Sequence, residues 1–376
     1  MRIAIVHDWL TGMRGGEKVL SLLCGLMPNA DLFTLVRVPG VCDTRIEGMP
    51  IRTSFLNHLP GVRRYYRYLL PFMPLAIEQM DASGYDLIVS CSHCVAKGIR
   101  QSPQAAHVCY CLTPMRYIWS QGEAYRDSMG LSGLALRLAQ GYLRAWDRRS
   151  ARHVDTFLAN SRNVAERIRR CYGRASEVVH SPIDTAFFTP SSEVREDYYL
   201  MVTALSPYKR VDQAVAAFAE LDRPLRVIGD GPLIKDLRRH APENVTIMGW
   251  QSDDVVREHY RRCRALIYPG EEDFGLVPLE AMACSAPAIA YAAGGALETV
   301  LDLNCESGFG PTGILYAPQT VEALVSAVKR FEGNEGRFKR NVLAAWAQRF
   351  SPDRFLTQFK LVAATLLSEK GLPAPW

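Results

Sequence analysis

Seven residues separate Glu272 from Glu280 in a segment that is otherwise mostly apolar and rich in glycine and proline (PGEEDFGLVPLEAMACSAPAIAYAAGG, 269–295). A carboxylate at the edge of a core segment is costly unless another group satisfies it. The strand predicted for ALIYPG (265–270) ends directly before the first glutamate, and Gly275 is expected at the start of a helix. Both carboxylates are therefore expected at one end of a sheet.

This pattern fits the chemistry of a sugar nucleotide. The free N–H groups at a helix start bind a phosphate, and the helix dipole adds to the attraction. Glu272 and Glu280 would repel a phosphate, but carboxylates accept strong hydrogen bonds from hydroxyl groups. The structural alternative is that the two glutamates cap the helix or pair with arginines.

Two further groups follow strands in the same way. Lys209 and Arg210 come after the strand YYLMVTAL, where they oppose the dipole of the next helix and so indicate a nearby anion such as a diphosphate. Gly15 and Gly16 follow the first strand in GMRGGEK, where the backbone could approach a ligand closely. The alternatives are solvated basic residues and a tight turn before a helix.

The elements that must position these residues alternate between strands and helices. Short apolar runs such as RIAIVH, YDLIVS, YYLMVTAL and APAIAYAAGG are separated by helical stretches, which predicts an α/β fold with parallel sheets. The pattern lapses into proline, serine and charge between 181 and 197. We therefore expect two Rossmann-like domains, 1–188 and 189–350, facing each other across a cleft. A final helix in 351–376 would pack back on the first domain.

Composition bounds the possible functions. The 376 residues carry a formal net charge of +5, which favours anionic small molecules or acidic lipid surfaces over nucleic acid. Because no apolar run approaches the roughly 18 residues of a membrane-spanning helix, we expect a cytoplasmic chain. The ten cysteines are expected to be reduced thiols. Buried thiols are favoured over a zinc site at the closely spaced pairs Cys91, Cys94, Cys109 and Cys111.

Several motifs resemble the family-four retaining glycosyltransferases, which have the GT-B fold. GDGP (229–232), GW (249–250), the glutamate block EDFGLVPLE (272–280) and AAGG (292–295) are similar, in order, to the donor-binding half of that family. NSRNVAERIRRCYG and SPID fit the end of its first domain. HDWLTGMRGGEKVL and CYCLTPMRYIW resemble a bacterial branch that includes O-antigen and exopolysaccharide mannosyltransferases. The resemblance covers nearly the whole chain.

The resemblance implies a retaining, metal-independent hexosyltransferase with no cofactor besides its nucleotide-sugar donor. Glu272 would bind the donor sugar and, with Lys209, form the catalytic pair. The donor would be GDP-mannose, and the acceptor a polyprenyl-diphosphate-linked glycan of cell-surface polysaccharide or lipopolysaccharide synthesis. Glu280 would bind the ribose, with the remaining donor contacts at Gly15, Gly16, Arg210, Gly229, Gly249, Trp250, Phe274, Gly275, Leu276 and Val277. The acceptor side would include Arg116 and Tyr117.

Two positions depart from the family pattern. Ala204 stands where the family usually has an arginine, and Leu112 stands where it tends to have a histidine. Arg210 or Arg116 could replace the arginine, whereas His107 lies in a predicted strand and is expected to be a core residue. These departures support an alternative hypothesis, in which the chain is a catalytically weak or silent sugar-nucleotide-binding protein. A GT-B-type sugar-nucleotide epimerase is the other alternative.

The segment Leu59–Met80 combines three arginines with aromatic and apolar residues (LPGVRRYYRYLLPFMPLAIEQM). Such a composition suits a segment lying on an anionic membrane surface, which a lipid-linked acceptor would require. It equally suits an ordinary amphipathic helix with a solvated basic face. Peripheral contact with the cytoplasmic face of a membrane is therefore one of two readings, and the oligomeric state is left open.

Overall fold

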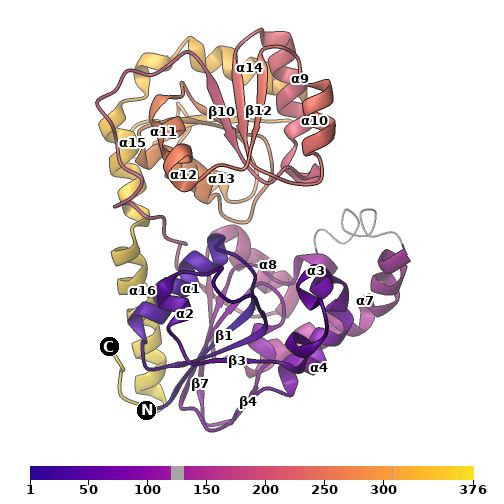
Figure 1. The fold of residues 1–376 in the computed structure, drawn as a ribbon. Coiled ribbons are helices and arrows are strands. Elements are labelled where there is room, and N and C mark those ends of the chain that lie inside the picture. The colour runs from indigo at the N-terminus through magenta and orange to yellow at the C-terminus, as the bar shows by residue number, and fades with distance from the viewer. Residues whose placement is uncertain (120–130, 307) are drawn as a thin grey trace. The chain divides into compact units, whose positions relative to one another are not determined.

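The computed structural model describes residues 1–119, 131–306 and 308–376, which form two compact units. The first unit contains residues 1–181 together with 355–376, and the second contains residues 182–354. Each unit is a parallel sheet covered by helices (Figure 1). The chain passes between units at 181/182 and 354/355, where the sequence pattern predicted 188/189 and 350/351.

The sheet of the first unit has seven parallel strands in the order β3-β2-β1-β5-β7-β8-β9. Strand β1, in the interior of the sheet, is buried along its whole length, because an apolar run of this kind is covered on both faces. The strands are β1 (Ile3–Leu10), β2 (Asp31–Arg37), β3 (Ile51–Thr53), β5 (Leu87–Ser92), β7 (Ala106–Cys111), β8 (Thr156–Ala159) and β9 (Glu177–Val178); β4 (Asp81–Ala82) pairs with β6 (Arg100–Gln101).

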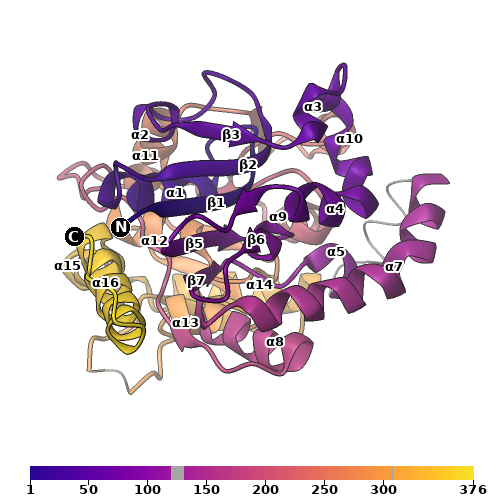
Figure 2. The same cartoon turned by 90° about the horizontal axis from the view of Figure 1, so that it is seen from below.

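Helices cover both faces of this sheet (Figure 2). One face is covered by α1 (Gly15–Leu26), α2 (Thr44–Glu47) and α16 (Pro352–Glu369). The other face is covered by α3 (Val62–Tyr65), the 3-10 helix η2 (Tyr66–Phe72), α4 (Met73–Glu78), η3 (Ala96–Gly98), α5 (Arg116–Trp119) and α7 (Leu131–Ser150); α8 (Arg162–Tyr172) packs beside β8.

The last helix of the chain belongs to the first unit. Phe355, Phe359 and Ala363 of α16 are buried against strands of the first sheet, and the rings of Phe355 and Tyr110 lie 5.3 Å apart. The tail therefore forms a helix whose apolar residues pack on the sheet of the first unit, as the sequence predicted.

The second unit has six parallel strands in the order β12-β11-β10-β13-β14-β15. Helices α9 and α14 pack on each other, and α12 packs on α11 and α15. The strands are β10 (Tyr199–Val202), β11 (Leu225–Ile228), β12 (Val245–Gly249), β13 (Leu266–Tyr268), β14 (Ala288–Tyr291) and β15 (Gly313–Tyr316). The helices are α9 (Val211–Leu221), α10 (Ile234–His240), α11 (Asp253–Arg262), α12 (Leu276–Ala283), α13 (Ala296–Thr299), α14 (Val321–Glu332) and α15 (Arg340–Ala347).

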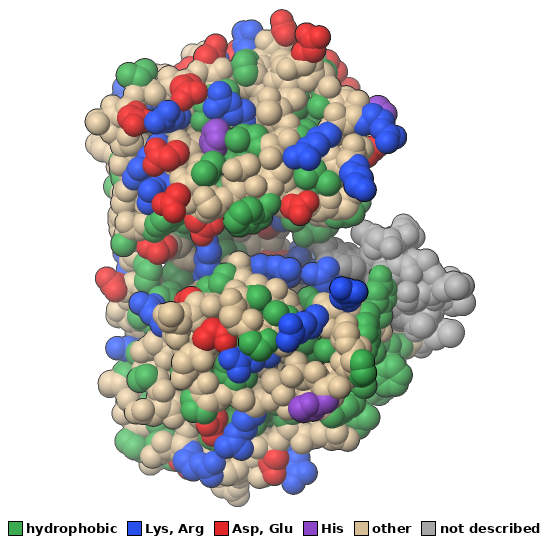
Figure 3. Space-filling view, viewed as in Figure 1, with side chains coloured by type: hydrophobic (Ala, Val, Ile, Leu, Met, Phe, Trp, Pro, Cys, Tyr) green, Lys and Arg blue, Asp and Glu red, His purple; other side chains and the backbone are tan. Residues whose placement is uncertain are grey.

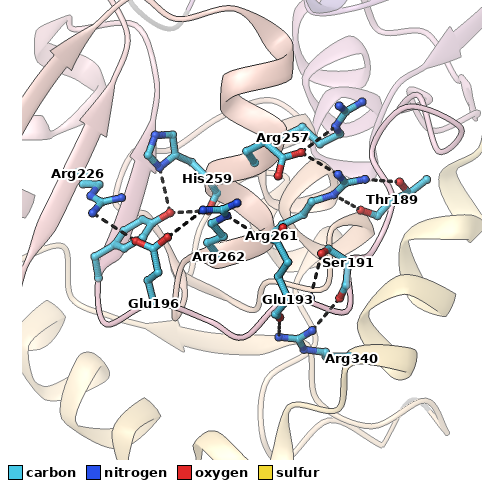
Figure 4. A network of polar contacts seen from close by, with 12 residues as sticks. Thr189, Ser191, Glu193, Glu196, Arg226, Arg257, His259, Arg261, Arg262 and Arg340 are labelled. Atoms are coloured by element: carbon cyan, nitrogen blue, oxygen red, sulfur yellow. Dashed lines mark hydrogen bonds and ion pairs between the residues drawn. The ribbon is translucent and has the colours of Figure 1, made fainter.

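The proline- and serine-rich stretch after residue 188 is held on the second unit by arginines (Figure 4). Arg261 of α11 donates hydrogen bonds to the carbonyl and hydroxyl oxygens of Thr189, at 2.8 and 2.7 Å. Arg340 at the start of α15 donates to the carbonyl oxygens of Ser191 and Glu193. A segment whose composition suggested a loose linker is therefore fixed through its backbone.

The structure also bears on the membrane and on the thiols. Within residues 1–119, 131–306 and 308–376, no helix has the length and hydropathy needed to cross a bilayer. Cys91, Cys94, Cys109 and Cys111 are buried free thiols. Burial raises the pKa of the Cys109 thiol to about 12, so this thiol is protonated and unreactive near neutral pH.

Candidate functional site

The strand order of the second sheet reverses between β10 and β13, although all of its strands are parallel. Strands β11 and β12 follow on one side of β10, and β14 and β15 follow on the far side of β13. The loops that leave two such neighbouring strands run to opposite sides of the sheet, which opens a ligand site at their carboxyl ends. Lys209 follows β10 and Glu272 follows β13, so both predicted catalytic residues lie at this point.

Lys209 and Glu272 form an ion pair between their side chains. Their side chains are 12% and 27% exposed, so the pair is accessible but largely shielded from solvent. The two loops touch through their backbones, because a Cβ atom on Gly270 would lie 3.1 Å from the Cα atom of Lys209. The structure therefore brings the two predicted catalytic residues together.

Arg210 has a different environment from Lys209. Its backbone is left-handed (φ 54°), and it is the N-cap residue of α9. Its guanidinium lies 3.4 Å from the carboxylate of Asp212, which is on the same helix, and its side chain is 37% exposed. The cation that meets Glu272 in the structure is thus Lys209.

A buried tyrosine lies beside each glutamate. The hydroxyl of Tyr260 donates to Oε2 of Glu280 at 3.4 Å. The hydroxyl of Tyr268 is buried and faces Glu272. Burial raises the pKa of both tyrosines, and the neighbouring carboxylates raise the pKa values further. Both tyrosines therefore stay protonated, and each glutamate keeps acceptor capacity for a ligand.

The start of α12 lies between the two glutamates. Gly275 is its N-cap residue with φ +100°, a conformation that favours glycine. Because glycine has no side chain, it cannot cap the helix, and the amides of Leu276 and Val277 in the first turn have no acceptor within the helix. Pro278 takes a position in that turn at which an amide is not needed. The structure thus provides backbone donors where an anion is expected.

A glycine pair fixes this loop from behind. The amide of Gly295 donates to the carbonyl oxygen of Glu272 at 2.8 Å. A side chain at Gly294 or Gly295 would overlap the backbone of Glu272 or Phe274. The AAGG motif therefore allows the backbone of the glutamate loop to approach closely, which its sequence alone did not reveal.

Gly229 and Gly249 end the neighbouring strands β11 and β12. The amide of Gly229 donates to the carbonyl oxygen of Gly249 at 2.9 Å, and both glycines have positive φ values, +145° and +81°. A Cβ atom on Gly229 would overlap the carbonyl oxygen of Thr203 in the loop after β10. Trp250 directly follows and is 74% exposed. These residues form the edge of the same loop cluster.

In the first sheet the strand order reverses between β1 and β5. Gly15 and Gly16 are the first two residues of α1 rather than part of a loop. The side chain of Leu112 lies against them, since a Cβ atom on Gly16 would be 2.8 Å from Cδ1 of Leu112. Arg116 and Tyr117 are the half-buried first residues of α5.

Four polar residues at this second point were not predicted from the sequence. His7 and Asp8 in β1, Glu17 in α1 and His93 after β5 form one cluster, in which His7 Nε2 lies 3.9 Å from Glu17. His7 and Asp8 are completely buried. The available signal was a histidine and an aspartate directly after the apolar run RIAIV, at the carboxyl end of a strand.

Asp8 determines the shape of the loop after β5. Its two carboxylate oxygens accept four backbone hydrogen bonds of 2.6–3.0 Å, from His93, Cys94, Val95 and Ala96. Burial opposes ionisation of Asp8, but His93, His7 and the loop amides outweigh it, so the pKa of this carboxyl lies below its ordinary value.

We expect Asp8→Asn to lower the free energy of unfolding by about 3 kcal/mol at pH 7, because buried amides lose charge-assisted partners. Since the folded pKa is depressed, the stabilisation is fully present above the unfolded pKa of about 3.9 and is lost progressively as the pH falls below that value toward the folded pKa. Urea unfolding between pH 7 and pH 3.5 should therefore show a weaker pH dependence for the variant. Glu369→Gln, at an exposed site in α16, is the control; equal curves for wild type and Asp8→Asn would contradict this assignment.

Both units match known families of enzymes. Residues 14–187 match Glycosyltransferase Family 4, and residues 183–349 match Glycosyl transferases group 1. The chain also aligns over 97% of its length with all of Anabaena Alr3699/HepE in its complex with UDP, at a TM-score of 0.70 and 18% identity.

Curated relatives align over shorter stretches. An uncharacterized glycosyltransferase of Methanocaldococcus jannaschii is 37% identical over 28% of this chain and 32% of the relative. A GDP-mannose-dependent alpha-(1-6)-phosphatidylinositol monomannoside mannosyltransferase of Mycolicibacterium smegmatis is 30% identical over 48% and 54%. The O-antigen chain mannosyltransferase C of Escherichia coli is 25% identical over 47% and 49%.

The chain thus spans about half or less of the length of these curated relatives. Its structural match, in contrast, extends over nearly the whole chain, and the two family matches together follow the two units. The predicted fold, with two Rossmann-like domains, is confirmed. The chain has the GT-B fold and consists of a Glycosyltransferase Family 4 domain followed by a Glycosyl transferases group 1 domain.

Proposed function

We propose that this chain transfers mannose from GDP-mannose onto a glycan carried by a polyprenyl diphosphate, with retention of the anomeric configuration and without a metal ion. The observation that carries the proposal is the Lys209–Glu272 ion pair beside the start of α12. A cation and a carboxylate beside the amides of a helix start, with a second carboxylate in the same helix, suit a diphosphate joined to hydroxylated rings. The names of two relatives favour mannose and a surface glycan.

The residues of the second unit have distinct roles in this proposal. The amides of Phe274 to Val277 and the ammonium of Lys209 bind the diphosphate, and Lys209 stabilises the charge that develops as its bond to the sugar breaks. Glu272 accepts hydrogen bonds from the sugar and Glu280 from the ribose. The acceptor hydroxyl then bonds through its oxygen to the same face of the sugar carbon and gives its proton to the departing diphosphate, so the configuration is retained.

The first test is ligand-induced thermal stabilisation of the purified chain with GDP, UDP, ADP and their common sugar conjugates. We expect the largest shift with GDP and GDP-mannose, growing with concentration relative to the dissociation constant. If UDP or ADP alone stabilises the protein, the assigned base is wrong. Binding without transfer to any acceptor would instead favour the silent sugar-nucleotide-binding protein.

Glu280→Gln should weaken binding of the nucleotide by about 1–3 kcal/mol, because the ribose loses a charged acceptor. Isothermal titration with GDP measures this loss directly. Glu243→Gln, which changes an exposed carboxylate of the same unit, should bind GDP like the wild type. Equal affinities of Glu280→Gln and the wild type would remove Glu280 from the donor site.

The acceptor side of the proposal rests on the segment 59–80, which folds as α3, η2 and α4. Tyr68, Phe72 and Leu75 are 53%, 58% and 49% exposed, although they are large and apolar. The three arginines of this segment are also exposed. Figure 3 shows basic and hydrophobic side chains side by side in this part of the first unit. We propose that this surface contacts anionic lipid on the cytoplasmic face of a membrane.

Changing Arg63, Arg64 and Arg67 together to glutamine should weaken binding to phosphatidylglycerol vesicles by roughly 3 kcal/mol, since each basic residue near such a surface contributes about 1 kcal/mol. Vesicle sedimentation at low and high salt measures the effect, and salt should abolish the difference. The matched control changes Arg100, Arg152 and Arg170, which are exposed elsewhere on the first unit. A control variant that loses as much binding would contradict a localised surface.

A further inference from the structure

His93 lies where the strand order of the first sheet reverses, between β1 and β5. It directly follows β5, and β5 pairs in parallel with β1. The four backbone hydrogen bonds from the loop to Asp8 fix the main chain of residues 93–96. A side chain on this loop is therefore held in place by a buried charge at the carboxyl end of the sheet, where ligands bind in folds of this class.

The imidazole of His93 is also fixed. Oδ2 of Asp8 lies 3.0 Å from Nδ1, at ion-pair distance, although the angle is outside that of a good hydrogen bond. The ring of Trp9 meets the imidazole edge-on, with 4.5 Å between centroids. Nδ1 is buried while the side chain keeps 22% exposure. The exposed edge is therefore the one that carries Nε2.

Asp8 also determines which nitrogen carries the proton. An ionised carboxylate beside Nδ1 favours a proton there, which leaves the lone pair of a neutral imidazole on Nε2. The other charged groups of the cluster are farther away: the rings of His7 and His93 are 5.8 Å apart, and Glu17 lies beyond His7. The arrangement presents one hydrogen-bond acceptor, Nε2, at the exposed edge.

Polar groups continue from this point toward the basic segment. The ring of Tyr66 packs on the ring of Trp9, with 5.3 Å between centroids. The Tyr66 hydroxyl accepts a hydrogen bond from Nε of Arg67 at 3.2 Å and lies 3.3 Å from the hydroxyl of Thr11. The ring of Trp9 thus contacts both His93 and Tyr66, and Tyr66 is hydrogen-bonded to Arg67.

We propose that His93 is an acceptor-binding residue: Nε2 accepts the hydrogen bond of the sugar hydroxyl that receives the transferred hexose. The acceptor class is a hydroxylated sugar joined to an anionic group, which the arginines of segment 59–80 attract. This inference rests on the proposed transferase function. Its structural basis is the immobilised imidazole, the Asp8 carboxylate behind it and the Tyr66–Arg67 contact beside it.

The first experiment follows the His93 imidazole by nitrogen and proton NMR in the full-length protein, with the signal assigned by its loss in His93→Gln. The probes are methyl α-glycosides of mannose, glucose, galactose and N-acetylglucosamine and their decyl-diphosphate glycosides. We expect neutral His93 to carry its proton on Nδ1 and the Nε2 signal to shift saturably with at least one probe. A proton on Nε2, or no shift with any probe, would overturn the proposal.

Two substitutions separate this role from a structural one. Asparagine reproduces the position of Nδ1 and keeps a group beside Asp8, whereas glutamine places an acceptor near the position of Nε2. With the probe that shifts the signal as acceptor, His93→Asn should lower kcat/KM for the acceptor about 10- to 100-fold, and His93→Gln should recover much of it. Equal losses in both variants would show that His93 only supports the loop.

The donor provides the control that distinguishes the two proposals. Both His93 variants should keep the thermal stabilisation by GDP that the wild type shows, because Lys209, Glu272 and Glu280, to which the main donor contacts are assigned, lie in the second unit. If GDP binds but His93 does not respond to any glycoside, the acceptor inference alone fails. If no nucleotide stabilises the wild type, both the proposed function and the inference about His93 fail.

Discussion

Replacing Lys209 by methionine is expected to lower kcat about 10²- to 10³-fold, which is the typical effect of removing one preorganised group that stabilises developing charge. The structure gives the reason, because the ammonium is held by Glu272 beside the free amides of α12. Methionine keeps most of the length and apolar volume of the side chain and removes the ammonium, together with its cation–π contact over the ring of Tyr208.

Steady-state transfer and thermal unfolding of the same preparations test this prediction. Stability should change little, because a partly exposed ion pair contributes only about 0–1 kcal/mol. Lys235→Met removes an exposed lysine of the same unit and should leave kcat unchanged. A Lys209→Met variant with the turnover of the wild type would show that the leaving group is stabilised elsewhere, and Arg210 would then be the next residue to change.

Replacing Lys97 by methionine is expected to lower the free energy of unfolding by about 3–5 kcal/mol, since it leaves the buried carboxylate of Asp147 without its cation. Both side chains of this ion pair are almost completely buried, at 1% and 0% exposure. Lys97 also donates to the carbonyl oxygen of Cys94 at 3.3 Å, and Asp147 accepts a hydrogen bond from Trp119 at 2.7 Å. The pair therefore joins α7 to the loop that carries His93.

Urea unfolding followed by tryptophan fluorescence measures the loss. The double variant Lys97→Met with Asp147→Asn should be less destabilised than the sum of the single variants, because no unpaired charge remains buried. Arg100→Met breaks an exposed ion pair with Asp81 in the same unit and should cost less than about 1 kcal/mol. If Lys97→Met is as stable as the wild type, this ion pair does not hold α7 in place.

The local pattern predicted more of the second unit than of the first. The order of apolar runs and helices indicated parallel sheets, and the carboxyl ends of parallel strands meet at one edge of a sheet. This pattern alone therefore placed Lys209 after a strand and Gly275 at a helix start, and it placed Glu280 in the same helix, where the structure has it in the middle rather than near the start. The prediction succeeded because each of these positions depends on the element directly before it.

The pairing of these residues depends on the order of the strands in the sheet. Lys209 meets Glu272 because β10 and β13 are neighbours, and neither segment encodes that order locally. The contact of Tyr260 with Glu280 likewise joins two different helices, α11 and α12. The glycines of the AAGG motif have their role only because the glutamate loop folds over them.

The sequence by itself determined the α/β class, the presence of a final helix, and the positions of Lys209 and Glu272 in loops that follow strands. All of these follow from short-range periodicity and from residues adjacent to strands. Only the tertiary structure decided that Asp8 binds the loop of His93, and that Gly15 and Gly16 belong to a helix. It also decided that the buried Tyr260 donates to Glu280. The physical reason is that hydrogen bonds and burial between distant segments depend on how the strands assemble, which local propensity does not specify.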